Sequence, residues 1–308
     1  MKNIKIFTVS LLLAFSLILT VSAQEYTKYT GALLWKVSGN GLEKPSYILG
    51  THHLKDVSFV DQIYGLKDVI DETQQVVGEL IMSDQAAMQA KMTLAAVMPE
   101  GETYEKMLSK DEYNDLQTGL KDIMGVGLEN MGQFKPGLIS SVASVMLYSK
   151  IYPDYNMMSH EPIDGYVQRI AKEQSKPVLG LETIDDQIAV LFDAEPLKDQ
   201  AISLACFMKH RNIASSQLQQ LDGLYEKGDV NGIYDLSFNN PNDPCPTSQV
   251  QKHALGKARN DKWLLQLPEM MQTASSLVAV GVLHLAGEEG LLFQLAEKGY
   301  KVEAVKAE

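Results

Sequence analysis

The stretches Tyr47-Ile-Leu-Gly-Thr-His-His53 and Val278-Ala-Val-Gly-Val-Leu-His284 lie near opposite ends of the chain and share one pattern. Each is an apolar, strand-like run followed by Gly-x-x-His. A glycine at the end of a strand permits a tight turn, so each stretch predicts a strand that turns a histidine side chain back over the edge of a sheet. We therefore expect both strands in one sheet, although a single Gly-x-x-His carries little information.

Two further strand-like runs end on a glutamate. Gln75-Val-Val-Gly78 is followed by Glu79, and Lys176-Pro-Val-Leu-Gly180 is followed by Leu181 and Glu182. Ligands of open α/β sheets bind beyond the carboxyl ends of the strands. Two imidazoles and two carboxylates gathered there match a site for a divalent transition metal such as Mn, Co, Zn or Fe. In the alternative interpretation Glu79 is an exposed turn residue, and Glu182 is an acid at the N-terminus of the next helix.

The doubled histidine leaves two candidates for one ligand. His52 alternates to the other side of the chain from His53, so we prefer His53 as the ligand and expect His52 to be structural. Asp164 is expected to be a helix N-terminal acid rather than a catalytic one. The remaining histidines are predicted to lie on the surface: His160, His210 and His253.

The other segments complete the expected fold. Gly31–Ser38 and Ser46–Leu49 predict a hairpin with a longer loop, and Tyr300–Val305 predicts a last strand. Residues 84–160 contain amphipathic helical patterns and no convincing strand, and residues 183–235 are again helical. We predict an α/β (α+β) protein with a central mixed β-sheet, strand–Gly-x-x-His units at both ends of the chain, and a helical insertion over residues 84–160 that acts as a lid.

Length and charge exclude some classes of protein. The chain has 308 residues, near the upper limit for one hydrophobic core. Its formal net charge is −12, from 27 basic and 39 acidic residues. A nucleic-acid-binding protein needs a basic surface, so we do not expect nucleic acid as a partner. The sequence makes no prediction of the oligomeric state.

The first 23 residues resemble a secretory signal peptide. Lys2 and Lys5 precede an apolar stretch, and Val21-Ser-Ala23 offers small residues for cleavage after Ala23. A membrane anchor is the alternative, but the apolar stretch is short for that, and no later run approaches a membrane span. Removal of the two lysines makes the net charge two units more negative. We expect an exported protein, periplasmic or secreted, with residues 24–308 forming a single domain.

Two cysteines fit that compartment. Cys206 lies in an apolar helical stretch and Cys245 lies in a loop between prolines. Since an exposed free thiol is a liability in an oxidising compartment, we predict a Cys206–Cys245 disulfide.

Several short pieces together resemble the TraB/GumN family, which includes the Tiki-type metalloproteases. These pieces are Leu33-Leu-Trp-Lys-Val37, the two Gly-x-x-His stretches, Gly180-Leu-Glu-Thr183 and Arg259-Asn260. The resemblance spans about residues 31–305. It implies a divalent-metal site built from His53, His284 and Glu79, with Arg259 and Asn260 nearby.

The expected function is metal-dependent hydrolysis of an extracytoplasmic peptide or protein. Glu79 or Glu182 would act as general base, and Arg259 would clamp a carboxylate or stabilise an oxyanion. In the alternative the protein binds a metal, haem or peptide without turning it over, and Arg259 is a surface arginine of a helix. An esterase that acts on a small molecule is a third possibility.

Overall fold

The computed structural model describes residues 28–82, 85–157 and 159–307. The predicted signal peptide lies outside these residues. The described strands are β1 (Leu34–Ser38), β2 (Ser46–Thr51), β3 (Gln75–Gly78), β4 (Val178–Gly180), β5 (Ser276–Gly281) and β6 (Lys301–Ala304). They form one sheet with the order β4-β3-β5-β2-β1-β6. The predicted mixed α/β architecture is confirmed, and both strands that carry Gly-x-x-His stand side by side in the centre.

The direction of the strands divides the sheet. β2, β3, β4 and β5 run parallel to one another, while β1 pairs antiparallel with β2 and with β6. All residues of β2 and β3 are buried, as expected for parallel strands covered on both faces. The parallel arrangement places the carboxyl ends of four strands at one edge, where His53, Glu79, Glu182 and His284 follow their strands.

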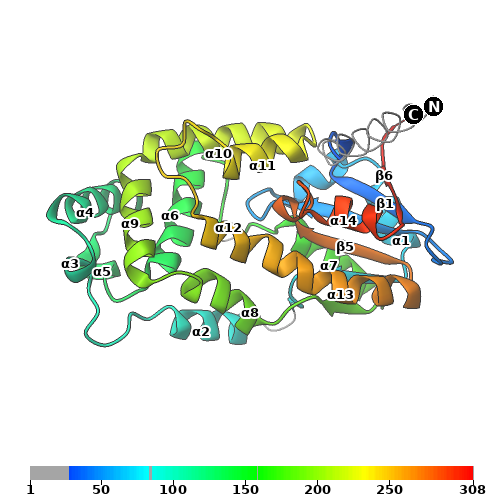
Figure 1. The fold of residues 1–308 in the computed structure, drawn as a ribbon, viewed down its shortest axis with the longest axis horizontal. Coiled ribbons are helices and arrows are strands. Elements are labelled where there is room, and N and C mark those ends of the chain that lie inside the picture. The colour runs from blue at the N-terminus through cyan, green and yellow to red at the C-terminus, as the bar shows by residue number, and fades with distance from the viewer. Residues whose placement is uncertain (1–27, 83–84, 158, 308) are drawn as a thin grey trace, which may run out of the picture.

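Helices cover the sheet and extend far beyond it (Figure 1). They are α1 (Leu66–Glu72), α2 (Gln85–Ala95), α3 (Tyr104–Met107), α4 (Lys110–Met124), α5 (Leu128–Met131), α6 (Pro136–Ile151), α7 (Ile163–Glu173), α8 (Ile184–Ile188), α9 (Leu197–Lys209), α10 (Arg211–Glu226), α11 (Val230–Phe238), α12 (Gln249–Leu255), α13 (Lys257–Thr273) and α14 (Leu291–Glu297). Short turns of other helix types are η2 (Val57–Gln62), η3 (Ala189–Asp193) and η4 (Val282–His284).

Local signals explain several of these boundaries. α4 begins with a capping box, in which Ser109 accepts a hydrogen bond from the backbone of Glu112 and Glu112 accepts one from the backbone of Ser109. Pro136 is the first residue of α6, where its missing N–H leaves no intrahelical bond unmade. The helical stretch after β4 is interrupted before Leu197, at His210 between α9 and α10, and around Gly228 between α10 and α11.

The helical region has a hydrophobic core of its own. This second core is separate from the sheet core and is formed by buried residues of α3, α4, α5, α6 and α9. α9 packs so closely on α4 that a Cβ atom at Gly119 would lie 2.5 Å from the Cβ of Met208. Helices α3 to α6 therefore share this core with α9, which follows β4 in the chain. In Figure 1 these helices lie at one end of the molecule and the sheet lies at the other.

The predicted disulfide is present. Cys206 of α9 is bonded to Cys245, which lies in the loop between α11 and α12. The bond ties the second core to the segment that leads into α12 and α13.

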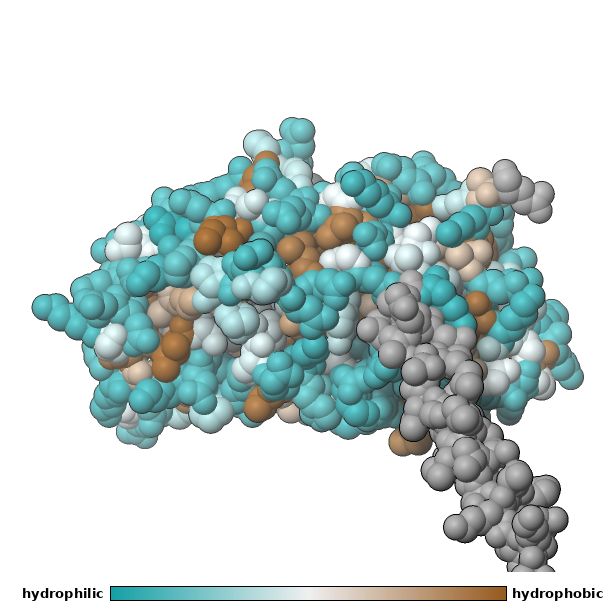
Figure 2. Space-filling view, turned by 45° about the horizontal axis from the view of Figure 1, so that its top comes forward, coloured by the Kyte–Doolittle hydropathy of each residue, from teal (hydrophilic) through white to brown (hydrophobic). Residues whose placement is uncertain are grey.

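The surface is mostly hydrophilic. Figure 2 shows one face on which separate hydrophobic patches are surrounded by hydrophilic residues. Leu94 and Leu265 are among the large apolar side chains that are exposed. Among the described helices, none combines the length and the apolar character that a membrane span requires.

Candidate active site at the carboxyl edge of the sheet

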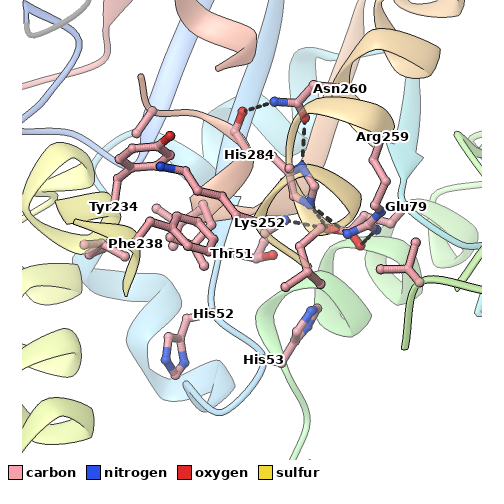
Figure 3. A pocket seen from close by; sticks show the side chains of 18 of the residues that line it. Thr51, His52, His53, Glu79, Tyr234, Phe238, Lys252, Arg259, Asn260 and His284 are labelled. Atoms are coloured by element: carbon pink, nitrogen blue, oxygen red, sulfur yellow. Dashed lines mark hydrogen bonds and ion pairs between the residues drawn. The ribbon is translucent and has the colours of Figure 1, made fainter. Parts of the chain in front are cut away.

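A cavity of about 510 Å³ lies beyond the carboxyl ends of β2, β3 and β5. The sheet edge supplies Thr51, His53, Glu79 and His284, and the opposite wall comes from η3, α11, α12 and the start of α13. Figure 3 shows these side chains. The volume is that of a typical pocket for a small molecule or for the end of a chain.

The two Gly-x-x-His turns are in contact with each other. β2 and β5 are parallel neighbours, and Thr51 pairs with Gly281 at their carboxyl ends. A Cβ atom at Gly50 would lie 3.1 Å from the Cγ2 of Val282, tighter than most packing contacts. Glycine at position 50 therefore lets the second turn approach, and His284 follows in η4.

Glu79 is fixed at the base of the cavity by backbone and side-chain donors. Its Oε1 accepts a hydrogen bond of 2.7 Å from the backbone N–H of Gly281 and lies 4.0 Å from Nε2 of His284. Its Oε2 accepts a bond of 2.5 Å from Nη2 of Arg259. The carboxylate is only 11% exposed, so the interpretation of Glu79 as an exposed turn residue is wrong.

Arg259 lies at the centre of the cluster (Figure 3). Its Nε and Nη2 donate to the two oxygens of Glu182, at 3.0 and 2.5 Å. Its Nη1 lies 2.8 Å from Nε2 of His284. The guanidinium carbon lies 4.8 Å from the centre of the Trp263 ring, one helical turn further along α13. Arg259 is thus a buried residue of the cluster, and the surface-arginine alternative is wrong.

Asn260 sets the tautomer of His284. Its Nδ2 donates to two backbone carbonyls, those of His284 at 3.1 Å and Glu289 at 2.8 Å. Carbonyls only accept, so the amide nitrogen must face them and Oδ1 must face Nδ1 of His284, at 2.8 Å. The proton of a neutral His284 therefore resides on Nδ1, and the lone pair of Nε2 faces Arg259 and Glu79.

The charges of this cluster are strongly perturbed. Burial, opposed only in part by Glu79, lowers the pKa of His284 to about 3, so its ring is neutral at physiological pH. Burial also opposes ionisation of Glu79, but its interactions with His284, Arg259 and His53 outweigh burial and lower its pKa to about 2. The edge of the sheet therefore presents an anionic carboxylate beside a neutral imidazole.

His53 stands apart from this cluster. Its Nδ1 lies 3.3 Å from Oδ2 of Asp164, and 65% of its side chain is exposed. The hydrogen bond to Asp164 raises the pKa of His53 to about 9. Asp164 lies in the first turn of α7 as expected, and it also orients His53, a contact that the sequence did not reveal.

The other histidines near this loop are structural. The ring of His52 lies 5.5 Å from that of Tyr225 and 6.3 Å from that of Tyr148, and burial lowers its pKa to about 4. The surface prediction for His160 is wrong, because its side chain is only 9% exposed. Its Nε2 lies 2.7 Å from the carbonyl oxygen of His53, and this contact helps to hold the loop that carries His53.

The donor set suits a divalent cation in part. A neutral imidazole whose second nitrogen is held by an amide, next to an ionised carboxylate, is the usual environment of a metal ligand. His53, Glu79 and His284 do not bring their ligand atoms within 4.8 Å of one another. Among the described residues only Cys206, His210 and Cys245 do so, and there the sulfurs are bonded to each other. Glu79 and His284 thus fit such an ion. His53 could be the third ligand only if its side chain lay closer to Glu79 and His284.

The fold and the site define an α/β protein with a His–Glu–Arg cluster at the carboxyl edge of a mixed sheet, framed by two Gly-x-x-His turns. The model of the TraB/PrgY/gumN family matches residues 33–304. The chain belongs to this family, as the sequence motifs predicted.

A relative supports a metalloprotease-like interpretation at the level of the family. The chain is 22% identical over 327 aligned positions to a protein of Danio rerio named metalloprotease TIKI2. The alignment covers 90% of this chain and 61% of the relative, so the chain spans less than two thirds of that protein. No solved structure matches the chain significantly.

Proposed function

We propose that the protein is an exported, metal-dependent peptidase whose site lies at the carboxyl edge of β2, β3 and β5. The observation that carries this proposal is the pair of Glu79 and His284. An anionic carboxylate lies 4.0 Å from a neutral imidazole whose lone pair is turned toward it by Asn260. The matched family and the name of the relative support the same class of chemistry.

His284, Glu79 and His53 would hold the cation. When bound, a divalent ion lowers the pKa of a coordinated water molecule and polarises a carbonyl group. His53 reaches the cation only if its loop moves toward Glu79, and its proton must leave because a ligating imidazole is neutral. Cation binding at this site therefore competes with protonation of His53.

The remaining residues act on the substrate and on protons. Both oxygens of Glu182 are bonded to Arg259, so we assign Glu182 the task of holding the guanidinium rather than that of a base. Arg259 donates to His284 and Glu79 in the absence of a cation, and the same donors suit the oxygen of a peptide carbonyl as negative charge develops on it. Glu79 lines the cavity whereas Glu182 does not, so of the two carboxylates we assign Glu79 as the one that would accept a proton.

Two features support export. The amino-terminal sequence has the pattern of a signal peptide, and the Cys206–Cys245 disulfide suits an oxidising compartment. The substrate would then be an extracytoplasmic peptide or protein.

The test is to purify the chain from residue 24 and measure bound metal by elemental analysis. Cleavage of a peptide library is then followed with and without a chelator. We expect bound Mn, Co, Zn or Fe and chelator-sensitive cleavage, both lost in His284→Ala and Glu79→Gln. His253→Ala and Glu269→Gln change exposed residues and serve as matched controls.

The other outcomes would indicate a different function or would exclude the metal site. Bound metal without chelator-sensitive cleavage would favour the non-catalytic binding protein. Hydrolysis of small esters but not of peptides would favour the esterase. Metal-free protein in which neither His284→Ala nor Glu79→Gln has an effect would overturn the metal site.

A further inference from the structure

The end of the cavity opposite Glu79 is apolar and aromatic. We call it the helix-side subsite and define it by Tyr234, Phe238 and Lys252, and Leu191, Leu221 and Ile233 line the same cavity. In Figure 3 the rings of Tyr234 and Phe238 lie on the other side of the cavity from Arg259 and Glu79. None of these residues takes part in the proposed metal chemistry.

The cations that line the cavity differ in their partners. Arg259 is paired with Glu79 and Glu182, and Nζ of Lys257 lies 2.8 Å from Oδ2 of Asp261. Within the described part of the chain, no carboxylate oxygen lies within 4.0 Å of Nζ of Lys252. Of these three cationic side chains in the cavity wall, Lys252 is therefore the one that no carboxylate of the described residues contacts.

Lys252 is nevertheless held in place. Its Nζ lies 5.0 Å from the centre of the Tyr234 ring and 5.4 Å from that of Phe238, and it donates a bond of 3.3 Å to Oδ1 of Asn239. The Tyr234 ring in turn packs against Gly287, where a Cβ atom would lie 3.3 Å from its Cζ. The ammonium group is thus held close to two aromatic rings and has no carboxylate partner. Such a group is suited to bind an anion that carries an apolar group beside it.

We propose that the helix-side subsite binds the carboxyl-terminal residue of a peptide, with its free carboxylate on Lys252 and an apolar or aromatic side chain against Tyr234 and Phe238. This inference deepens the proposed peptidase function and rests on it. It makes Lys252 a specificity-determining residue and restricts the substrates to peptides whose carboxyl terminus is free.

Charge at the two ends of the cavity favours this orientation. The sheet end contains the carboxylates of Glu79 and Glu182 with the single guanidinium of Arg259 between them. Arg259 is already paired with both carboxylates, and the proposed cation would act on the scissile carbonyl, so neither is available to a substrate carboxylate. At the helix side it meets Lys252, so the peptide would enter with its carboxyl end toward α12.

The experiment compares pairs of peptides that end in phenylalanine as the free acid or as the amide. For the wild-type protein we expect KM for the acid to be about tenfold or more below that for the amide, as for a charge-assisted hydrogen bond. Lys252→Met keeps the apolar stem and should abolish this preference with little change in kcat. Lys252→Arg should retain it, and Lys110→Met, at an exposed lysine, should have no effect.

A binding measurement separates this inference from the proposed function. N-acetyl-phenylalanine and its amide are titrated into the chelator-treated protein by calorimetry, without any turnover. Binding of the acid alone, lost in Lys252→Met, would support the subsite even if no peptide is cleaved. Equal binding of acid and amide, binding of neither, or an unchanged preference in Lys252→Met would overturn it, whatever the result of the chelator experiment.

Discussion

Oδ1 of Asn260 lies 2.8 Å from Nδ1 of His284, while Nδ2 of the same amide bonds the carbonyls of His284 and Glu289. One side chain on α13 therefore fixes the position of the turn after β5 and also decides which nitrogen of His284 is protonated.

Asn260→Ala tests this relationship. The change leaves Nδ1 of His284 and two carbonyls without a partner, so we expect the free energy of unfolding to fall by about 1–3 kcal/mol. Loss of the group that orients a ligating imidazole should weaken metal binding by about 10- to 100-fold. Urea unfolding of chelator-treated protein and a competition titration with Zn²⁺ measure the two effects. Asn130→Ala, at an exposed position of α5, is the matched control, and a full-affinity Asn260→Ala protein would contradict the assigned role.

Arg259→Gln tests whether the guanidinium and a cation compete for the same groups. Without metal, the buried carboxylates of Glu79 and Glu182 lose their counter-charge, and stability should drop by about 3–5 kcal/mol. Because Nε2 of His284 and Oε2 of Glu79 are then no longer bonded to Arg259, Zn²⁺ should bind about tenfold more tightly and restore the melting temperature. Cleavage should fall by about 100-fold or more.

The conservative change Arg259→Lys keeps a charge but not the fork that bonds Glu182. It should be more stable than Arg259→Gln in the absence of metal. Weaker Zn²⁺ binding in both variants would indicate that Arg259 assembles the site rather than competes with the cation.

The His53–Asp164 pair predicts a pH dependence of stability in chelator-treated protein. Asp164 raises the pKa of His53 from 6.5 to about 9. A raised pKa stabilises the folded state fully below pH 6.5, and this stabilisation is lost as the pH rises through 9. We expect Asp164→Asn to cost about 1 kcal/mol more at about pH 6 than at about pH 10, a small value because the imidazole is largely exposed. Asp111→Asn occupies the same first-turn position in α4 and should show no such difference in urea unfolding.

Removal of the disulfide should affect both stability and the cavity. Replacing Cys206 and Cys245 by serine opens a link across 39 positions, which should cost about 2–4 kcal/mol in urea unfolding. The released loop leads into α12, so binding of N-acetyl-phenylalanine to the helix-side subsite should weaken as well. Ser203→Ala, on an exposed face of α9, should change neither. Unchanged binding in the double variant would show that α12 is positioned without the bond.

The sheet and the residues at its edge were predictable because their signals are local. Apolar runs that end in Gly-x-x-His or Gly-Glu mark a strand and the residue that it delivers, and the parallel arrangement then gathers those residues at one edge. The resemblance to the family added Arg259 and Asn260, which no local pattern singles out.

What escaped prediction consists of contacts between distant segments. The carboxylate of Asp164 orients His53, the ring of His160 supports the carbonyl of His53, and α9 completes a core begun by α4 and α6. No periodicity reports such pairings, because each depends on the packing of elements that are far apart in sequence. The same holds for Lys252. That no carboxylate of the described residues contacts its ammonium group can be recognised only when all the side chains around the cavity have been placed.

The strand order determines at what stage of chain synthesis the site can form. β5 inserts between β3 and β2, although it is among the last elements to be synthesised. A chain interrupted before Ser276 has no strand to join Glu79 to the turn of His53, and it lacks His284 altogether. Whatever chemistry this edge performs is therefore withheld from any nascent or truncated form that ends before Ser276.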